Sequence, residues 1–192
     1  MKVVLLPGNG YHDDINKYYW FPYLIEKLTH LGLEVIAKNM PDWYLARRKY
    51  WEPFIIDTLK ADKNSILVGH SSGAAATMRV LEKIKVFGAI LVAGHYTDLG
   101  YREDKLSGYF DEPWKWSTIK KNTKWIAQFA SKDDPFIPIE HSRFINNKLN
   151  TEYFEFENEQ HFGYPNPKKE FPEIIELIKK KIKNNSSIFI FF

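Results

Sequence analysis

The strongest constraint on this chain is a set of six short apolar segments separated by stretches with helical periodicity. These segments predict strands at residues 3–6, 34–37, 66–68, 89–93, 125–129 and 153–156. Four of them lack polar alternation, which is typical of strands that are covered on both faces in a parallel sheet. The sequence therefore predicts an α/β fold with a doubly wound, mainly parallel sheet of about six strands and helices on both faces.

Helices are expected between these strands and after the last of them. The expected ranges are 17–30, 42–59, 72–83, 114–121, 139–148 and 171–183. Asp42 and Ser72 stand at positions that suit an N-cap, and Pro172 suits the first turn of the last helix.

The length and organisation of the chain predict one domain. The 192 residues contain no internal repeat, linker or block of like charge, and a chain of this size can bury a substantial core in a single unit. We expect this domain to span residues 1–183. Residues 184–192 are expected to form a disordered or loosely packed tail, because polar residues there lead into a short Phe-rich end.

The composition excludes several classes of protein. A formal net charge of +3 is too small to indicate nucleic acid as a partner. The absence of cysteine excludes disulfides and thiolate metal ligands, and it fits a cytoplasmic location. The first apolar run ends at Pro7, too early for a signal peptide, and no segment reaches the length of a membrane-spanning helix. No membrane partner is therefore expected.

The first two predicted strands argue against a nicotinamide cofactor. Gly8 and Gly10 resemble the start of a dinucleotide fingerprint, but position 13 is Asp rather than Gly. The second predicted strand runs into Lys38, without the acidic residue that would bind a ribose. We expect neither an organic cofactor nor a metal.

The stretch from Gly69 to Gly73, GHSSG, matches the pattern G-x-S-x-G. The pattern alone is weak, because a glycine-rich turn without chemistry also fits it. Its context is specific, since a predicted buried strand enters it and a predicted helix leaves it, as in a nucleophile elbow. We predict Ser71 as the nucleophile, with flanking glycines that avoid clashes on the tight turn. The backbone N–H of Ser72 then suits a developing oxyanion, and its side chain suits a helix cap.

A serine nucleophile needs a base and an orienting carboxylate, expected in the chain order Ser, Asp or Glu, His. His161 follows the last predicted strand, where its side chain can reach the same edge of the sheet as Ser71. His95 also follows a predicted strand and is the main alternative as base. Asp134, held by Pro135, is our choice for the acid, with the adjacent Asp133 as the alternative.

The loop after the first predicted strand is expected to supply a second oxyanion donor, the backbone N–H of Asn9. The substrate pocket is expected to include Tyr11 and His95. Tyr109, Trp114 and Trp116 predict either an aromatic wall beside the site or a buried cluster that packs one connecting segment.

Several stretches resemble the small serine hydrolases of the retinoblastoma-binding protein 9 family, which are related to the bacterial YdeN-type α/β-hydrolases. The matching stretches are PGNG at 7–10, AKNMPD at 37–42, GHSSG at 69–73, SGYF with PWxW over 107–116, DDPF at 133–136, and HF at 161–162. The resemblance implies a compact α/β-hydrolase with little or no lid domain. It also implies the triad Ser71, Asp134 and His161, and so favours Asp134 over Asp133.

Two stretches depart from the family. Tyr11, His12, Asp13 and Asp14 follow the first loop, where the family can carry further glycines, and they are expected to narrow the pocket or add charge to it. Residues 59–63 also lack the L-x-C-x-E pattern of retinoblastoma binding.

The sequence thus predicts a serine hydrolase that cleaves a small-molecule ester or amide through an acyl-enzyme intermediate. The family has been associated with such bonds, including those of amino-acid esters. The alternative is an interaction protein that keeps the α/β-hydrolase fold without turnover, because a fold does not fix a function.

Overall fold

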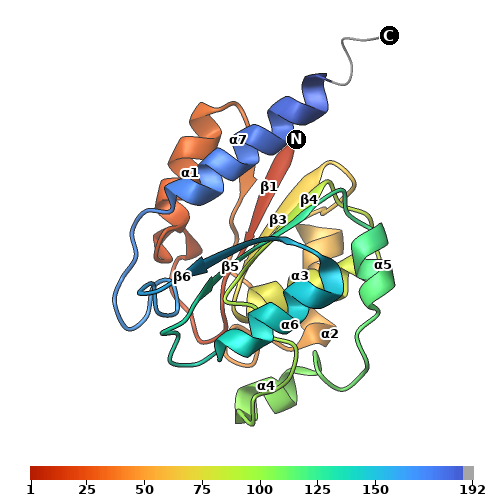
Figure 1. Ribbon diagram of the computed structural model, residues 1–192, viewed down its shortest axis with the longest axis vertical. Coiled ribbons are helices and arrows are strands. Elements are labelled where there is room, and N and C mark those ends of the chain that lie inside the picture. The colour runs from red at the N-terminus through yellow and green to blue at the C-terminus, as the bar shows by residue number, and fades with distance from the viewer. Residues whose placement is uncertain (188–192) are drawn as a thin grey trace.

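The sheet in the computed structural model, which describes residues 1–187, consists of six parallel strands (Figure 1). The strands are β1 (Lys2–Leu6), β2 (Glu34–Ile36), β3 (Ser65–His70), β4 (Gly88–Val92), β5 (Ile126–Ser131) and β6 (Glu152–Phe156). Their order across the sheet is β2-β1-β3-β4-β5-β6, and every neighbouring pair is parallel. All six predicted strands are confirmed, and so is the predicted fold class.

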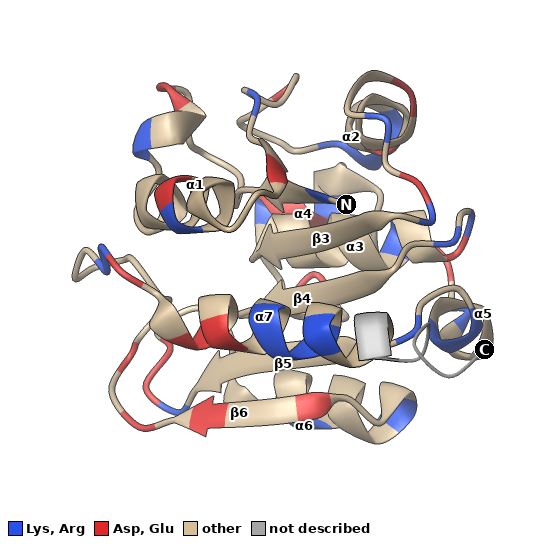
Figure 2. Ribbon diagram, turned by 90° about the horizontal axis from the view of Figure 1, so that it is seen from above, with Lys and Arg blue, Asp and Glu red and all other residues tan. Residues whose placement is uncertain are grey.

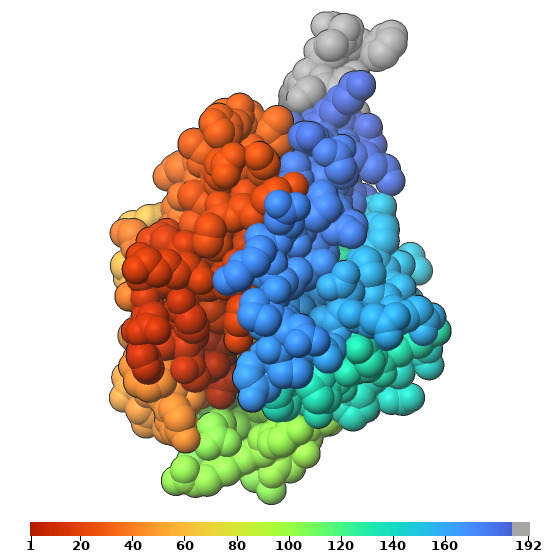
Figure 3. All heavy atoms as spheres, turned by 90° about the vertical axis from the view of Figure 1, so that its left-hand side faces the viewer, coloured from red at the N-terminus to blue at the C-terminus, as the bar shows by residue number. Residues whose placement is uncertain are grey.

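Helices cover both faces of the sheet. They are α1 (Phe21–His30), α2 (Arg48–Pro53), α3 (Ser72–Leu81), α4 (Arg102–Ser107), α5 (Trp116–Lys121), α6 (Ile139–Leu149) and α7 (Pro172–Ser187), with the short 3₁₀ helix η1 (Ile15–Lys17) and the π-helical turn η2 (Phe54–Thr58). Helices α1 and α7 lie on one face, and α2, α3, α5 and α6 lie on the other (Figure 1). Figure 3 shows α1 in orange beside α7 in blue, and these two helices are in contact.

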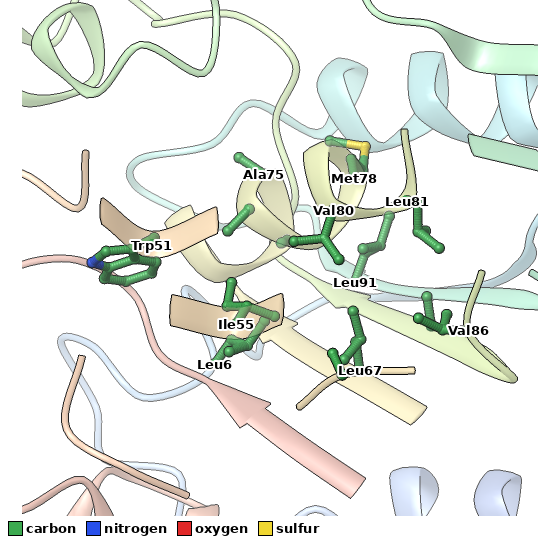
Figure 4. Close-up of a cluster of buried hydrophobic side chains, with 14 of the residues drawn as sticks. Leu6, Trp51, Ile55, Leu67, Ala75, Met78, Val80, Leu81, Val86 and Leu91 are labelled. Atoms are coloured by element: carbon green, nitrogen blue, oxygen red, sulfur yellow. The ribbon is translucent and has the colours of Figure 1, made fainter. Parts of the chain in front are cut away.

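The hydrophobic core has two parts, one on each face of the sheet, because successive side chains along a strand point to opposite faces and both sets are apolar. In β1, Val3 and Leu5 pack under α1 and α7, whereas Val4 and Leu6 pack under α2 and α3. The strands β3, β4 and β5 carry no charged residue, and Figure 2 shows the charges on helices and loops around them. Figure 4 shows the hydrophobic cluster between the sheet and helices α2 and α3. Leu6, Leu67 and Leu91 from the sheet face side chains of these helices and of η2, namely Trp51, Ile55, Ala75, Met78, Val80 and Leu81.

The second helix begins later than predicted. Asp42 was expected as its N-cap, but α2 starts at Arg48. The Asp42 carboxylate instead accepts hydrogen bonds from the backbone N–H and the guanidinium of Arg47, and residues 42–46 form a turn. Pro53 has no N–H to donate, and the chain continues from it as the π-helical turn η2 rather than as one helix to residue 59.

The C-terminal end of the described chain differs in part from the expected tail. Helix α7 continues beyond Lys183 to Ser187, so residues 184–187 are helical rather than part of a tail. The rest of the expected tail, residues 188–192, lies outside the described residues. Among residues 1–187, no helix is both long enough and apolar enough to cross a membrane.

The connection between β4 and α5 carries the short helix α4, which was not predicted. The expectation of little or no lid domain is confirmed for the described part of the chain.

Candidate active site

Ser71 lies on the tight turn between β3 and α3. Its backbone has φ 55° and ψ −119°, a conformation that L-residues rarely adopt and that surrounding structure must hold in place. A Cβ on Gly69 would lie 2.2 Å from the carbonyl oxygen of Gly73, and a Cβ on Gly73 would lie 2.4 Å from the carbonyl oxygen of Leu6. Both flanking positions therefore require glycine, as predicted from the sequence.

Ser72 links the turn to the loop after β1. It is the first residue of α3, so its N–H has no carbonyl partner within the helix. Its side chain was expected to cap the helix, but no such cap is present: the hydroxyl donates to Asn9 Oδ1 at 3.1 Å. Asn9 is held further by a hydrogen bond from its Nδ2 to the carbonyl oxygen of Tyr44, at 3.3 Å.

The loop after β1 passes directly over Ser71. The N–H of Gly8 donates to Tyr18 Oη at 3.0 Å, and that of Gly10 donates to the carbonyl oxygen of Trp43 at 2.8 Å. Between them, the N–H of Asn9 donates to no acceptor within residues 1–187. A Cβ on Gly8 would lie 3.2 Å from the Cβ of Ser71. The loop thus brings one unpaired N–H next to the turn that carries Ser71.

His161 and Asp134 form a buried pair. Nδ1 of His161 and Oδ2 of Asp134 are 2.8 Å apart, and the side chains are 10% and 3% exposed. The other oxygen of Asp134 accepts from the backbone N–H groups of Phe136 and Ile137, at 2.9 and 3.0 Å. These bonds fix the carboxylate, which in turn fixes the orientation of the imidazole.

Asp133 has a different position from its neighbour. Its Oδ1 accepts from the hydroxyl of Ser131 at 2.6 Å and from the backbone N–H of Gln160 at 2.8 Å. The Ser131 hydroxyl also accepts the N–H of Glu159 at 2.9 Å. Asp133 therefore holds the loop that carries His161, while Asp134 contacts the ring itself.

A cavity of about 420 Å³ opens beside these residues, and we call it the Ser71 cavity. Asn9, Ser71, Ser72 and His161 all line it. A larger hollow of about 980 Å³ lies between α2, η2 and α4, where Arg48 and Lys83 both pair with Glu52. The smaller cavity is the candidate active site because it brings together the predicted nucleophile and base.

Two of the predicted pocket residues line the Ser71 cavity. Tyr11 stands at one side with its ring edge-on to Tyr18, at a centroid distance of 4.8 Å. His95 is buried, and its Nε2 lies 3.4 Å from Oδ2 of Asp104 on α4. The alternative base thus faces a carboxylate from α4 and not Asp134.

The other predicted pocket residues, Tyr109, Trp114 and Trp116, were expected either as an aromatic wall of the site or as a packed cluster, and the structure contradicts their place in the pocket. Among the described residues they are not part of the cavity lining. Tyr109 is fully buried, and Trp116 packs against Trp114 at 5.7 Å. Trp114 and Trp116 are partly buried and pack against the same hydrophobic cluster that contains Tyr109, which agrees with the other interpretation of these aromatic residues.

The buried Arg79 on α3 organises this cluster. Its guanidinium lies 3.8 Å from the ring centroid of Trp114 and donates to the carbonyl oxygens of Tyr109 and Glu112. It also pairs with Glu82 at 2.8 Å. Because these bonds satisfy its charge, a guanidinium can be fully buried behind the nucleophile helix.

Sequence reasoning missed several residues of the cavity. Glu103 and Asp104 reach it from α4, a helix whose polar sequence shows no apolar face. Tyr18 was missed because nothing in its local sequence indicates its partner.

Two buried groups beside the cavity have shifted pKa values. Burial raises the pKa of the Tyr18 phenol. The pKa of His70 lies well below its ordinary value, mainly because the ring is buried and secondly because His161 lies nearby. Within residues 1–187, no group of three or more His, Cys, Asp or Glu side chains is arranged to hold a metal ion.

A parallel sheet with a strained serine between its third strand and the next helix defines the α/β-hydrolase class. The chain belongs to the serine hydrolase family, whose model matches residues 3–180. It is similar to the serine hydrolase RBBP9 of Rattus norvegicus, with 38% identity over 182 residues, or 94% of this chain and 95% of that protein.

Two further comparisons support the family resemblance. The putative hydrolase YdeN of Bacillus subtilis (strain 168) is 30% identical over 156 residues, or 75% of this chain and 78% of that protein. The solved structure of the ydeN gene product from B. subtilis shares the fold, with a TM-score of 0.84 at 24% identity over 95% of this chain and 98% of that one. The resemblance predicted from the motifs is confirmed.

Proposed function

We propose that this protein cleaves a small ester or amide through an acyl-enzyme intermediate, with Ser71 as nucleophile, His161 as general base and Asp134 as the orienting acid. The observation that carries the proposal is the buried His161–Asp134 pair at the wall of the same cavity that holds Ser71. Membership of the serine hydrolase family supports it.

The chemistry follows from the positions of these groups. Ser71 Oγ attacks the carbonyl carbon, and Nε2 of His161 takes the hydroxyl proton. Asp134 accepts from Nδ1–H of His161, which keeps Nε2 free to take that proton and stabilises the imidazolium that forms. The same imidazolium then protonates the leaving alcohol or amine, and water releases the acyl group from Ser71.

The oxyanion of the tetrahedral intermediate would be stabilised by two backbone donors, the N–H groups of Asn9 and Ser72. Neither group has a protein acceptor within residues 1–187, and the two residues are joined by the hydrogen bond from Ser72 Oγ to Asn9 Oδ1. Donors that are fixed before the reaction need no reorganisation as negative charge develops.

The size of the cavity favours a small substrate. At about 420 Å³ it lies in the lower part of the range of small-molecule sites. Tyr11, Tyr19, Tyr44 and Tyr101 contribute to its lining, so the walls combine flat apolar surface with hydroxyl groups.

Labelling with a fluorophosphonate probe tests the nucleophile. Wild-type protein should form a covalent adduct, Ser71→Ala should form none, and Ser72→Ala should keep most of the labelling because it leaves the nucleophile in place. No adduct on folded wild-type protein would instead indicate an interaction protein without turnover.

Ester hydrolysis by variants of the two candidate histidines tests the base. His161→Ala should abolish hydrolysis of p-nitrophenyl acetate, whereas His95→Ala should retain it. The reverse result would move the role of base to His95.

A further inference from the structure

The residue before the proposed nucleophile, His70, sits in a chain of buried hydrogen bonds. Its Nδ1 lies 2.6 Å from Tyr18 Oη, and its Nε2 lies 2.8 Å from the backbone carbonyl oxygen of His161. Tyr18 Oη is in turn 3.0 Å from the backbone nitrogen of Gly8. His70 and Tyr18 are 1% and 3% exposed, so water does not compete for these bonds.

The partners fix where each proton lies. A carbonyl oxygen can only accept, so Nε2 of His70 carries a proton and donates it to His161. The neutral ring then accepts at Nδ1, and the Tyr18 hydroxyl must be its donor. The Tyr18 oxygen accepts from Gly8 N–H. The chain therefore runs in one direction, from Gly8 N–H through Tyr18 and His70 to the carbonyl of His161.

The two ends of this chain are the two sides of the candidate site. Gly8 directly precedes Asn9, the proposed oxyanion donor in the loop after β1. The other end is the backbone of His161, the proposed base, whose ring lies 4.8 Å from that of His70. Loops that are far apart in the sequence are thus joined through one imidazole at the end of β3.

We propose that Tyr18 and His70 are positioning residues that set the distance between the oxyanion donor at Asn9 and the base His161. This inference rests on the proposed function, because it assigns both ends of the link to that reaction. Neither Tyr18 nor His70 contacts the reacting atoms of the proposed reaction. Their contribution is to hold two backbone segments in register while Ser71 Oγ and the His161 ring exchange a proton.

The surroundings keep the ring of His70 in this neutral form. The rings of Tyr18, Tyr19 and Trp20 surround it at centroid distances of 5.7, 6.3 and 5.9 Å, and His161 is the nearest titratable group that can carry positive charge. A charged His70 would donate at Nδ1, so the Tyr18 hydroxyl could no longer donate there and would lose the acceptor that it has in this structure. Burial also favours the neutral ring, because it removes the water that would solvate a charged one.

Four variants test the link by steady-state kinetics with p-nitrophenyl acetate: Tyr18→Phe, His70→Leu, the double variant and His70→Gln. Tyr18→Phe should lower kcat about ten-fold and leave KM nearly unchanged, because misplaced groups weaken only the transition state. The double variant should be no slower than His70→Leu, since the chain is already cut. His70→Gln should retain more kcat than His70→Leu, because its amide can still donate to the His161 carbonyl.

Tyr109→Phe is the matched control. Tyr109 is another fully buried tyrosine, and its hydroxyl has no hydrogen-bond partner within the described residues. Its kcat should equal that of the wild type. Thermal unfolding of every variant separates loss of positioning from loss of fold.

Three outcomes would overturn the inference: an unchanged kcat in Tyr18→Phe, equal losses in Tyr18→Phe and Tyr109→Phe, or fully multiplicative losses in the double variant. The proposed function fails separately, if turnover persists in Ser71→Ala. Hydrogen exchange tests the link without turnover: exchange of the Gly8 amide should accelerate in both Tyr18→Phe and His70→Leu. Acceleration in neither would also overturn it.

Discussion

Asp134 contacts the ring of His161 through Oδ2 at 2.8 Å, whereas its neighbour Asp133 contacts the backbone of Gln160 through Oδ1 at 2.8 Å. Adjacent carboxylates thus hold the same loop in two ways, one through the imidazole and one through the main chain. Only the first of them can influence which nitrogen of His161 carries the proton.

The two aspartates should therefore respond differently to the same substitution. Asp134→Asn should lower kcat by about 10⁴-fold, because an amide no longer favours the tautomer in which Nε2 is free. Asp133→Asn keeps an oxygen that accepts from Ser131 and Gln160, and its kcat should stay within about three-fold of wild type. Steady-state ester hydrolysis measures both. Equal losses in the two variants would contradict the assignment.

The hydrogen bond between Ser72 and Asn9 predicts a smaller effect. Ser72→Ala removes the hydroxyl that holds Asn9 Oδ1 and leaves both backbone N–H groups in place. We expect kcat to fall by roughly three- to ten-fold, well below the loss of roughly 10²-fold or more that removal of an oxyanion donor itself causes. Single-turnover kinetics of acylation would measure this, and a loss as large as that of Ser71→Ala would assign the Ser72 side chain a direct role.

The glycines around Ser71 predict a steric effect on stability. In Gly73→Ala the new Cβ would lie 2.4 and 2.6 Å from the carbonyl oxygens of Leu6 and Pro7, so the free energy of unfolding should fall by about 3 kcal/mol or more. Gly94→Ala is the control, because its nearest neighbour would be the Cβ of Ala74 at 3.5 Å. It should stay within about 1 kcal/mol of wild type in urea unfolding. Similar losses in both variants would argue against the close approach at Gly73.

Two ion pairs of similar length predict very different contributions to stability. Arg79 and Glu82 are 2.8 Å apart and 0% and 2% exposed, while Arg143 and Glu155 are 2.7 Å apart and 50% and 21% exposed. Arg79→Met leaves Glu82 buried without its partner and should cost about 3–5 kcal/mol. Arg143→Met should cost less than about 1 kcal/mol, because water and salt screen the exposed pair. Urea unfolding compares them, and equal costs would contradict this dependence on burial.

The buried His70 predicts how stability depends on pH. Burial, and then the charge of the nearby His161, holds its pKa well below the ordinary value, so the folded chain keeps the ring neutral where the unfolded chain protonates it. Below pH of about 6.5 the unfolded state therefore binds more protons, and the free energy of unfolding falls as the pH falls toward the folded pKa. His70→Gln removes this contribution. Unfolding at pH 7 and pH 5 should show a smaller difference in the variant, and an equal difference would contradict a depressed pKa.

The elements that the sequence predicts correctly are those with a local signal. Short apolar segments mark all six strands, and the carboxyl ends of parallel strands must share one edge, so Ser71, Asp134 and His161 can be brought together by reasoning from order alone. The choice between Asp133 and Asp134 is not local, because it depends on which side of the strand end each carboxylate leaves.

What sequence reasoning missed depends on partners that are distant along the chain. The charge of Arg79 within a helix suggests a face exposed to solvent. Its guanidinium is instead buried and donates to the carbonyl oxygens of Tyr109, Glu112 and Pro113. Asp42 is a residue type that often caps helices, but its carboxylate accepts hydrogen bonds from Arg47 in a turn before the helix begins. The bond between Tyr18 and His70 joins residues 52 positions apart, and no periodicity reports such a contact.

The connection between β4 and α5 contributes to the cavity through His95, Tyr101, Glu103 and Asp104, yet it carries no member of the proposed triad. Its far end is tied to the helix behind the nucleophile by Arg79. This part of the cavity lining is therefore separate in the chain from the three residues of the proposed triad. Exchange of residues 95–107 would replace all four of these lining residues, and the proposed reacting groups would stay on strand ends that such an exchange does not touch.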